Sequence, residues 1–271
     1  MRALYRLACL LCLLAPWVAS PVRADEPAPE HHSWWWSWGQ GMFGLSLGGL
    51  TYGSGPNPVI GSDKLVHQTR PVSGVHALEL RGPIDVVLKQ GDAERVTVHT
   101  DDNLAELIET PVVDGVLHVG IRARASFKVK HPIGVTVELP HLDAVKMQGS
   151  GDLNCSQFDT DLLEITLMGS GDARFDALRV GTLAVLVQGS GNLSLSGNAP
   201  KQGYVIEGSG DIDADELIGR NVAIRISGSG DAKLMASATL SVEIAGSGDV
   251  DYRGEAILTK NVHGSGNITH H

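Results

Sequence analysis

The chain has 271 residues, of which 42% are hydrophobic and 19% are charged, and its formal net charge is −10 at pH 7. This acidic balance argues against nucleic acids and anionic membranes as partners, because both repel a negatively charged protein. Of its 3 cysteines, Cys9 and Cys12 lie close to the N-terminus.

Residues 1–24 have the pattern of a cleaved secretory signal peptide. Arg2 and Arg6 precede an apolar run, and the segment ends in the small residue Ala24. The sequence therefore predicts export to the periplasm, the cell surface or the medium. Loss of the signal removes two cysteines and three arginines, which leaves Cys155 without a disulfide partner and changes the formal charge from −10 to −13. No later segment approaches the roughly 20 apolar residues that a transmembrane helix needs.

Residues 25–62 form a segment of different composition, rich in proline, tryptophan and glycine. All the tryptophans that remain after signal removal lie together, at Trp34, Trp35, Trp36 and Trp38. Such a cluster suits two interpretations: a flexible leader whose rings pack on the end of the next domain, or an exposed patch that contacts sugar rings, a protein partner or a membrane interface. The sequence leaves both open.

Residues 63–140 contain several short runs in which apolar and polar side chains alternate, as in half-buried β-strands. Examples are residues 84–88 and 133–139, and Asp114-Gly115 between two pairs of apolar residues is a typical hairpin turn. Because the open end of a stack of strands exposes edges and core, we expect this less regular β region to begin and cap the regular part that follows.

A local basic run stands out in this acidic chain and consists of Arg122, Arg124, Lys128 and Lys130. It is interpreted either as a solvated loop or as a site for an anionic glycan. No pair of carboxylates is spaced convincingly near it for general acid–base work. His31 and His32 are adjacent but lack a third ligand, and the histidines at 67, 76, 99, 118, 131, 141 and 263 are scattered singly without metal-ligand spacing.

The second half of the chain contains seven copies of Gly-Ser-Gly followed by Asp or Asn, at steps of 18 to 20 residues. A fixed period of this size indicates one structural unit stacked on its copies. Apolar residues stand two and, except in the last copy, four positions before each copy, and they resume directly after the Asp or Asn, as in half-buried strands. The pattern predicts an all-β fold: a right-handed parallel β-helix of about 18–20 residues per coil over residues 141–269, each coil being strand, corner, strand and variable return loop.

The tetrapeptide is interpreted as the corner of each coil. Catalysis needs one activated serine, whereas this serine recurs in all seven copies, so we interpret it as part of the architecture. Glycine supplies positive φ or allows close backbone approach, and Asp or Asn is expected to bond its own downstream backbone in an Asx-turn. The corner glycines are Gly149, Gly151, Gly169, Gly171, Gly189, Gly191, Gly208, Gly210, Gly228, Gly230, Gly246, Gly248, Gly264 and Gly266.

An alternative interpretation is that the corners bind a cation. The aspartates of successive corners would stack in a column at about one strand spacing, where carboxylates repel unless backbone N–H groups or a cation compensate. Calcium between coils is one hypothesis; a geometric role, which Asn192 and Asn267 fill equally well, is the other. The sequence indicates no other cofactor. The candidate calcium ligands are Asp152, Asp172, Asp211, Asp231 and Asp249.

Ordered motifs before the repeat resemble a known family. Arg-Pro-Val-Ser-Gly at 70–74, Asp-Val-Val-Leu-Lys-Gln-Gly-Asp at 85–92 and Val-Thr-Val-Glu-Leu-Pro at 135–140 lead into the first corner. This order resembles the head GIN domain of putative auto-transporter adhesins, over roughly residues 62–268. The resemblance implies an exported β-helical domain, often associated with the cell envelope, which we place at residues 63–271.

These observations favour a non-enzymatic binding or structural module of the cell envelope that contacts a glycan or a protein through its outer faces. The alternative is a polysaccharide-binding or polysaccharide-cleaving β-helix protein, with Arg122 and Arg124 in its candidate site. Outward apolar positions such as Leu186 and Val205 also leave a side-by-side homo-oligomer open.

Overall fold

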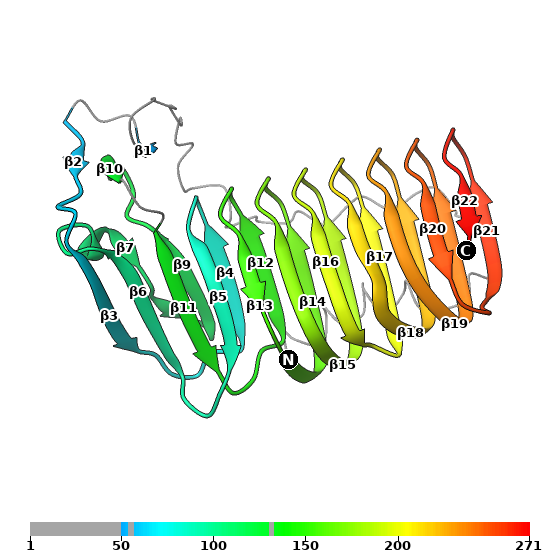
Figure 1. Cartoon of the computed structure of the whole chain (residues 1–271), viewed down its shortest axis with the longest axis horizontal. Coiled ribbons are helices and arrows are strands. Elements are labelled where there is room, and N and C mark those ends of the chain that lie inside the picture. Colours follow the sequence, from blue (N-terminus) through cyan, green and yellow to red (C-terminus); the bar gives the residue numbers. More distant parts are fainter. Residues whose placement is uncertain (1–49, 54–56, 130–132) are drawn as a thin grey trace, which may run out of the picture.

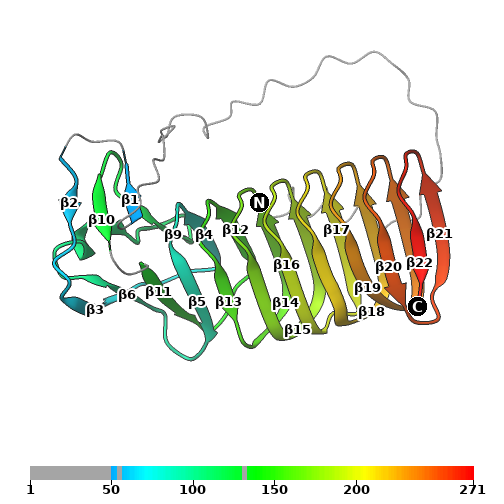
Figure 2. The same ribbon diagram turned by 45° about the horizontal axis from the view of Figure 1, so that its top comes forward.

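The computed structural model describes residues 50–53, 57–129 and 133–271. The predicted signal segment, the four tryptophans of the leader and Lys130 lie outside the described residues. Within them, the secondary structure is β apart from one 3-10 turn, η2 (Ala105–Leu107). The strands stack side by side into a rod, with the chain advancing by one coil at a time toward the C-terminus (Figures 1 and 2).

The regular part of the rod is built from parallel strands, each paired with its equivalents in the neighbouring coils. Its strands are β12 (Ala144–Gln148), β13 (Leu153–Cys155), β14 (Phe158–Leu167), β15 (Ala173–Val187), β16 (Leu193–Asn198), β17 (Lys201–Ile206), β18 (Ile212–Ile226), β19 (Ala232–Ile244), β20 (Val250–Arg253), β21 (Ile257–Val262) and β22 (Ile268–His270).

The register of these strands follows the sequence period. Leu153 pairs with Ala173, Ala173 with Leu193, and Leu193 with Ile212, so the residue after each corner stacks on its equivalent. The apolar columns before the corners stack in the same way, as in the pairing of Ile165 and Val185. The prediction of a parallel β-helix is confirmed.

The return segment of the coil differs from the expected variable loop, because it is mostly strand. β15 continues past its first three residues, bulges between Phe175 and Leu178, and then pairs with β14 from Leu178 onward. Ala177 at the bulge has a φ of 46°. Leu178 and Val180 point inward and are buried, so a third line of apolar side chains makes this segment a wall of the coil.

Among the described residues, the core between these walls is apolar apart from Thr160 of β14 and a polar pair on β17. Gln202 and Tyr204 occupy inward columns that are otherwise filled by leucine, isoleucine and valine, and both are fully enclosed. The Tyr204 hydroxyl donates to Gln202 Oε1 at 2.8 Å, and Gln202 Nε2 donates to the carbonyl of Ala199 at 3.0 Å and of Leu217 at 3.3 Å. Burial raises the pKa of Tyr204, so its hydroxyl stays protonated and available as a donor.

The predicted cap combines parallel and antiparallel pairing. β4 and β5 continue the rod as an irregular first coil, since they pair in parallel with β12 and β13, while β3 pairs antiparallel with β6, and β6 with β11. The predicted turn at Asp114-Gly115 joins β8 to β9 with positive φ at both residues. The cap strands are β3 (Leu65–Pro71), β4 (Ala77–Arg81), β5 (Asp85–Gln90), β6 (Arg95–Asp101), β7 (Ile108–Glu109), β8 (Val112–Val113), β9 (Val116–Ile121) and β11 (Gly134–Leu139).

A small second sheet stands beside the cap (Figure 1). It contains β1 (Leu50–Tyr52), β2 (Val59–Ile60) and β10 (Phe127–Val129), with β10 in the middle. The ring of Tyr52 packs on that of Phe127, with 5.0 Å between centroids. Two strands of this sheet thus come from the segment predicted as a leader, because an aromatic contact and a β ladder hold them to the cap.

Candidate functional site

The corner glycines are required by close backbone approach. A Cβ on Gly169 would overlap the carbonyl oxygen of Gly149, and one on Gly171 would overlap that of Gly151; the same holds for each later corner. The carbonyl of Gly149 also accepts the N–H groups of Ser170 at 2.9 Å and Gly171 at 3.2 Å. None of the glycines of the seven Gly-Ser-Gly copies is among the positive-φ glycines of the described chain. Of the two predicted reasons for glycine, stacking is therefore the one that applies.

The aspartates and asparagines of the corners form a hydrogen-bonded ladder along the rod. The N–H of Asp172 donates to Asp152 Oδ1 at 2.9 Å, and that of Asn192 donates to Asp172 Oδ1 at 2.8 Å. The ladder continues to Asn267, whose N–H donates to Asp249 Oδ1 at 2.7 Å. Each side chain thus bonds the next coil, so the hypothesis of an Asx-turn within its own corner is wrong.

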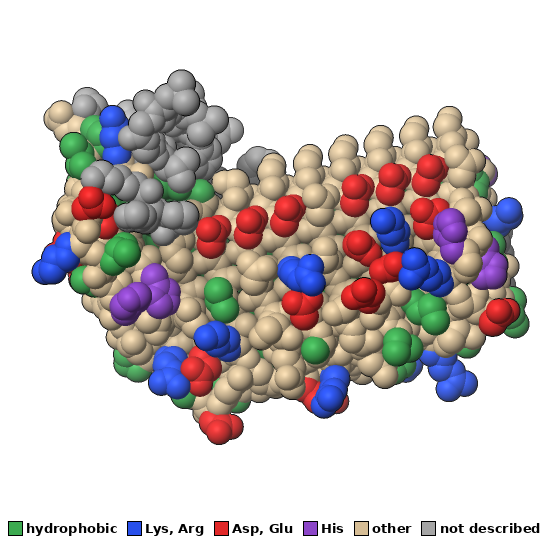
Figure 3. Space-filling model, viewed as in Figure 1, with side chains coloured by type: hydrophobic (Ala, Val, Ile, Leu, Met, Phe, Trp, Pro, Cys, Tyr) green, Lys and Arg blue, Asp and Glu red, His purple; other side chains and the backbone are tan. Residues whose placement is uncertain are grey.

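This ladder explains why Asp and Asn alternate freely. Both side chains carry the Oδ1 acceptor that the next N–H needs, so Asn192 serves Asp211 as Asp172 serves Asn192. The backbone supplies the compensation that stacked carboxylates require. The acidic members form a row near the corners (Figure 3). Among the described residues, no three His, Cys, Asp or Glu side chains are grouped to hold a metal ion; calcium binding stays a hypothesis.

Asp85 of the cap is the first member of the ladder, and sequence analysis missed it. Its Oδ1 accepts the N–H of Asp152 at 3.1 Å. Gly82 stands three residues before Asp85, as Gly149 stands three before Asp152, and a Cβ on Gly149 would overlap the backbone of Gly82. Gly82-Pro83-Ile84-Asp85 is thus a degenerate corner, recognisable by this spacing.

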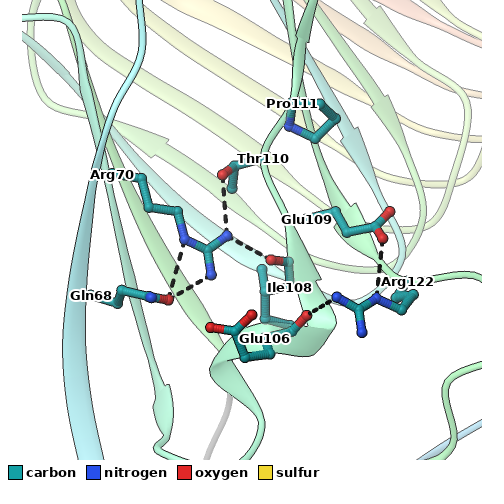
Figure 4. Close-up of a pocket in the computed structure, with 8 residues that line it drawn as sticks. All are labelled: Gln68, Arg70, Glu106, Ile108, Glu109, Thr110, Pro111 and Arg122. Carbon is teal, nitrogen blue, oxygen red and sulfur yellow. Dashed lines mark hydrogen bonds and ion pairs between the residues drawn. The ribbon is translucent and has the colours of Figure 1, made fainter.

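A shallow hollow on the cap, of about 590 Å³, lies around Arg70 of β3 (Figure 4). Every N–H of the Arg70 guanidinium is used: the group donates to the carbonyls of Ala105 and Ile108, to Thr110 Oγ1 and to Gln68 Oε1. Arg70 therefore fastens η2 and β7 to β3. The hollow is lined by Gln68, Arg70, Glu106, Ile108, Glu109, Thr110, Pro111 and Arg122.

The basic run is divided among different elements. Arg122 joins the hollow, where its Nη2 donates to the carbonyl of Glu106 at 2.7 Å and its Nε to Glu109 Oε1 at 3.3 Å. Arg124 lies in the turn after β9 with a φ of 63°, and Lys128 is exposed on β10 of the small sheet. Because Arg122 is already paired with a carboxylate, its remaining attraction for an anion is weakened.

A second hollow, of about 560 Å³, lies where the cap meets the first regular coil. Gln90 anchors it: its Nε2 donates to the carbonyls of Pro140 and Asp159, and its Oε1 accepts the N–H of Asp159 at 2.9 Å. The side chain thus ties β5 to β14, which gives the hollow a structural role. It is lined by Lys89, Gln90, Gly91, Asp92, Pro140, Ser156 and Gln157.

A buried carboxylate also joins the cap to the rod. Glu79 Oε2 accepts from Arg81 Nη2 at 2.7 Å and from His118 Nδ1 at 2.6 Å, and Lys146 Nζ lies 3.7 Å from Oε1. These side chains come from the adjacent strands β9, β4 and β12. A buried charge is tolerated only when it is paired, so these partners compensate the carboxylate that the junction buries. Sequence analysis missed it because the pairing of β4 with β9 follows no repeat.

Small and apolar residues lie together at outward positions in the middle of the rod. Leu186 on β15 pairs with Val205 on β17, and both are partly exposed. The next outward column holds the small residues Ala184, Gly203 and Ala223, of which Ala223 is partly exposed and the other two are buried. We call these five residues the central face. Polar side chains surround it: Gln188 bonds Glu207 at 2.7 Å, and Arg225 lies 3.9 Å from Glu243.

Cys155 is an internal residue and not a reactive site. Its side chain is buried in the core. Burial is the largest cause that raises the pKa of the Cys155 thiol to about 11. Because the thiolate is the reactive form, the thiol is inert at neutral pH.

Comparison with known proteins agrees with the family resemblance found in the sequence. The family model described as "Putative auto-transporter adhesin, head GIN domain" matches residues 75–256. The chain belongs to this family. The resemblance found in the sequence is thereby confirmed. No curated protein is significantly similar to the chain.

Several solved structures share the fold of this head GIN domain. A putative adhesin from Bacteroides fragilis is 23% identical, with 79% of this chain and 100% of that chain covered and a TM-score of 0.75. A putative adhesin from Parabacteroides distasonis is also 23% identical, with the same coverage and a TM-score of 0.65. A putative lipid binding protein from Parabacteroides distasonis is 21% identical, with the same coverage and a TM-score of 0.67. In the described part of this chain, no helix is long and apolar enough to cross a membrane.

Proposed function

We propose that this head GIN domain protein is a non-enzymatic, adhesin-like module of the cell envelope that binds a glycan or a protein through the outer surface of its rod. Its family and structural neighbours are described as putative adhesins, and the predicted signal peptide supports an exported location.

The central face is the observation that carries this proposal. Its five residues are small or apolar and lie on three neighbouring strands, and Leu186, Val205 and Ala223 are partly exposed. An apolar centre with a polar rim is the usual anatomy of a protein interface. The small residues of this face also leave room for a sugar ring or an extended chain. The corner glycines and the Asp and Asn side chains, in contrast, contact the neighbouring coil.

Binding can be tested on the mature chain with a glycan array and with capture of proteins from envelope extracts. We expect a ligand whose binding weakens at least tenfold when Leu186→Asp puts a charge in the centre of the face. Ser194→Asp is the matched control, because Ser194 points outward on β16, away from this face. Replacement of Trp34, Trp35, Trp36 and Trp38 by serine tests the contribution of the leader. The absence of any ligand on the array and in the extract would contradict the proposal.

The same variants test homo-oligomerisation. If the central face pairs with a second copy, sedimentation velocity will show a dimer for the natural chain and a monomer for Leu186→Asp. A monomer at all concentrations would remove the homo-oligomer and leave glycan and envelope protein as the ligands.

A polysaccharide-cleaving activity predicts a different result. Product release from an anionic polysaccharide, abolished by Arg122→Gln or Arg124→Gln, would overturn the non-enzymatic proposal. We expect no products, because the Arg122 guanidinium is engaged by Glu109 and by the carbonyl of Glu106.

A further inference from the structure

Two histidines that are far apart in the sequence face each other on the outer surface of the cap. His67 of β3 and His99 of β6 are direct partners in the antiparallel ladder. Their Nδ1 atoms are 2.5 Å apart, and their ring centroids are 4.7 Å apart with the planes at 70°. His67 is exposed and His99 is partly exposed, so the pair lies at the surface.

A third strand orients one of these rings. His99 Nε2 lies 3.0 Å from Thr136 Oγ1 on β11. When Nε2 carries the proton and donates it to the hydroxyl, Nδ1 of His99 keeps its lone pair. This lone pair accepts the proton of His67 Nδ1 in the short contact.

The ladder itself does not require histidines at these positions. The next pair on the same face, Thr69 and Thr97, is joined by a contact between hydroxyls of 3.2 Å. Two imidazoles directly opposite each other are a poorer choice for stability, because protonation of both would place like charges face to face. A bound cation would instead hold the two rings together, since it attracts both lone pairs.

We propose that His67 and His99 form a surface site for a divalent transition-metal ion, with Thr136 as the residue that positions His99. The ion takes the place of the proton between the two Nδ1 atoms, and the single proton of the neutral His67 ring moves through solvent from Nδ1 to Nε2, so that both Nδ1 lone pairs face the ion. Metal–nitrogen bonds of about 2.0–2.1 Å with tetrahedral angles place two such nitrogens a little over 3 Å apart, which a small ring rotation achieves.

The ligand set defines the class of ion. Two imidazoles favour Cu²⁺, Ni²⁺ and Zn²⁺ over Mg²⁺ and Ca²⁺, with Cu²⁺ bound most tightly in the usual order of affinities. Since the described residues contain no group of three or more His, Cys, Asp or Glu ligands, water or a donor from another molecule completes the coordination. This inference is independent of the adhesin-like function.

The test uses the full chain in a parent variant in which His31, His32, His270 and His271 are glutamine, because these consecutive histidines would compete for metal. Cu²⁺ is added alone, and binding is followed by calorimetry and by electron paramagnetic resonance, which reports nitrogen ligands. We expect one equivalent bound, with a signature of two nitrogens, and affinity at least tenfold lower in His67→Gln and in His99→Gln. Thr136→Val should weaken binding by about tenfold, as is usual when the partner of a ligating histidine is lost.

His76→Gln is the matched control, because His76 is exposed and lies on the same cap without a histidine partner; its affinity should be unchanged. Cu²⁺ should also raise the unfolding temperature of the parent and not that of His67→Gln, since the ion would join β3 to β6. Circular dichroism without metal checks that the variants fold, and the exposed His67 gives the decisive comparison if His99→Gln is destabilised. Equal Cu²⁺ affinity in the parent and in His67→Gln, or no binding by the parent, would overturn the proposal.

Discussion

At the scale of single residues, the corner is defined by what stacks on it. The carbonyl of one glycine lies where the Cβ of the next coil would stand, and the carboxylate of one aspartate accepts the N–H of the next. Neither relation is visible within one copy of the repeat. Both become necessary once copies stack, and this is why glycine recurs without exception while Asp and Asn replace each other.

The first prediction concerns Gly171. Gly171→Ala should lower the free energy of unfolding by about 1–3 kcal/mol, because the new methyl group overlaps the backbone of the preceding coil. Gly203→Ala is the matched control: Gly203 lies in β17 of the same rod, and a Cβ there meets no atom within 4 Å. Urea denaturation measures both variants. Equal losses would contradict the stacking explanation.

The second prediction concerns the ladder at Asp211. Asp211→Ala removes the acceptor of the Asp231 N–H and should cost about 1 kcal/mol. Asp211→Asn retains Oδ1, as Asn192 does in the natural chain, and should cost much less. The difference between the two variants in thermal denaturation isolates the acceptor. If Asn proves as damaging as Ala, the ladder depends on charge and a bound cation becomes the better explanation.

The third prediction concerns Cys155. In the unfolded chain its thiol has the ordinary pKa of 9.0, and in the folded chain the pKa is about 11. The folded state therefore holds this proton more tightly, so the contribution of the group to stability is complete below pH 9 and is lost as the pH rises through 11. In the mature chain, which lacks Cys9 and Cys12, iodoacetamide at pH 8 should alkylate Cys155 of the urea-unfolded protein and leave Cys155 of the native protein intact. Equal rates would show that the thiol is not buried.

At the scale of elements, β17 contains a polar pair in an apolar core. Gln202→Leu should cost about 1–3 kcal/mol, because it leaves the buried Tyr204 hydroxyl without its acceptor. Tyr204→Phe removes that hydroxyl, so the double variant should recover part of the loss. A double-mutant cycle by urea denaturation measures the coupling. Additive losses in the double variant would show that the two side chains do not depend on each other.

The elements also show where sequence reasoning succeeds. Strands before and after each corner could be predicted because seven copies align, so that a single outlier such as Lys260 does not hide an apolar column. The return segment was expected to be a loop, since its apolar positions shift by a residue at the bulge near Ala177. Because the length of this segment differs between copies, aligning the copies on their corners does not bring its apolar positions into register.

The candidate sites were harder to predict than the strands. His67 faces His99, and Glu79 faces His118, only because particular cap strands are neighbours. These pairings join residues that are 32 and 39 positions apart and obey no period. In contrast, the outward position of Leu186 and Val205 follows directly from the repeat, and the structure places them side by side.

At the scale of the whole molecule, the rod is a one-dimensional stack in which each coil contacts mainly its neighbours. Stability is then close to a sum of coil terms and contacts between adjacent coils. Such a molecule tolerates a change in the number of coils and does not tolerate a change in register within a coil.

Removal of one complete coil tests whether each repeat is one structural unit of the rod. Deletion of residues 212–231 joins Asp211 to Ala232, which stands in the repeat where Ile212 stood, and every column and the ladder continue unbroken. Deletion of residues 212–221 is the control, because it ends half-way through a coil. We predict that the first variant folds cooperatively into a rod shorter by about 4.8 Å, seen by circular dichroism and small-angle X-ray scattering, and that the second does not fold. Failure of the first variant to fold, or equal folding of both variants, would contradict the conclusion that one repeat is the structural unit of the rod.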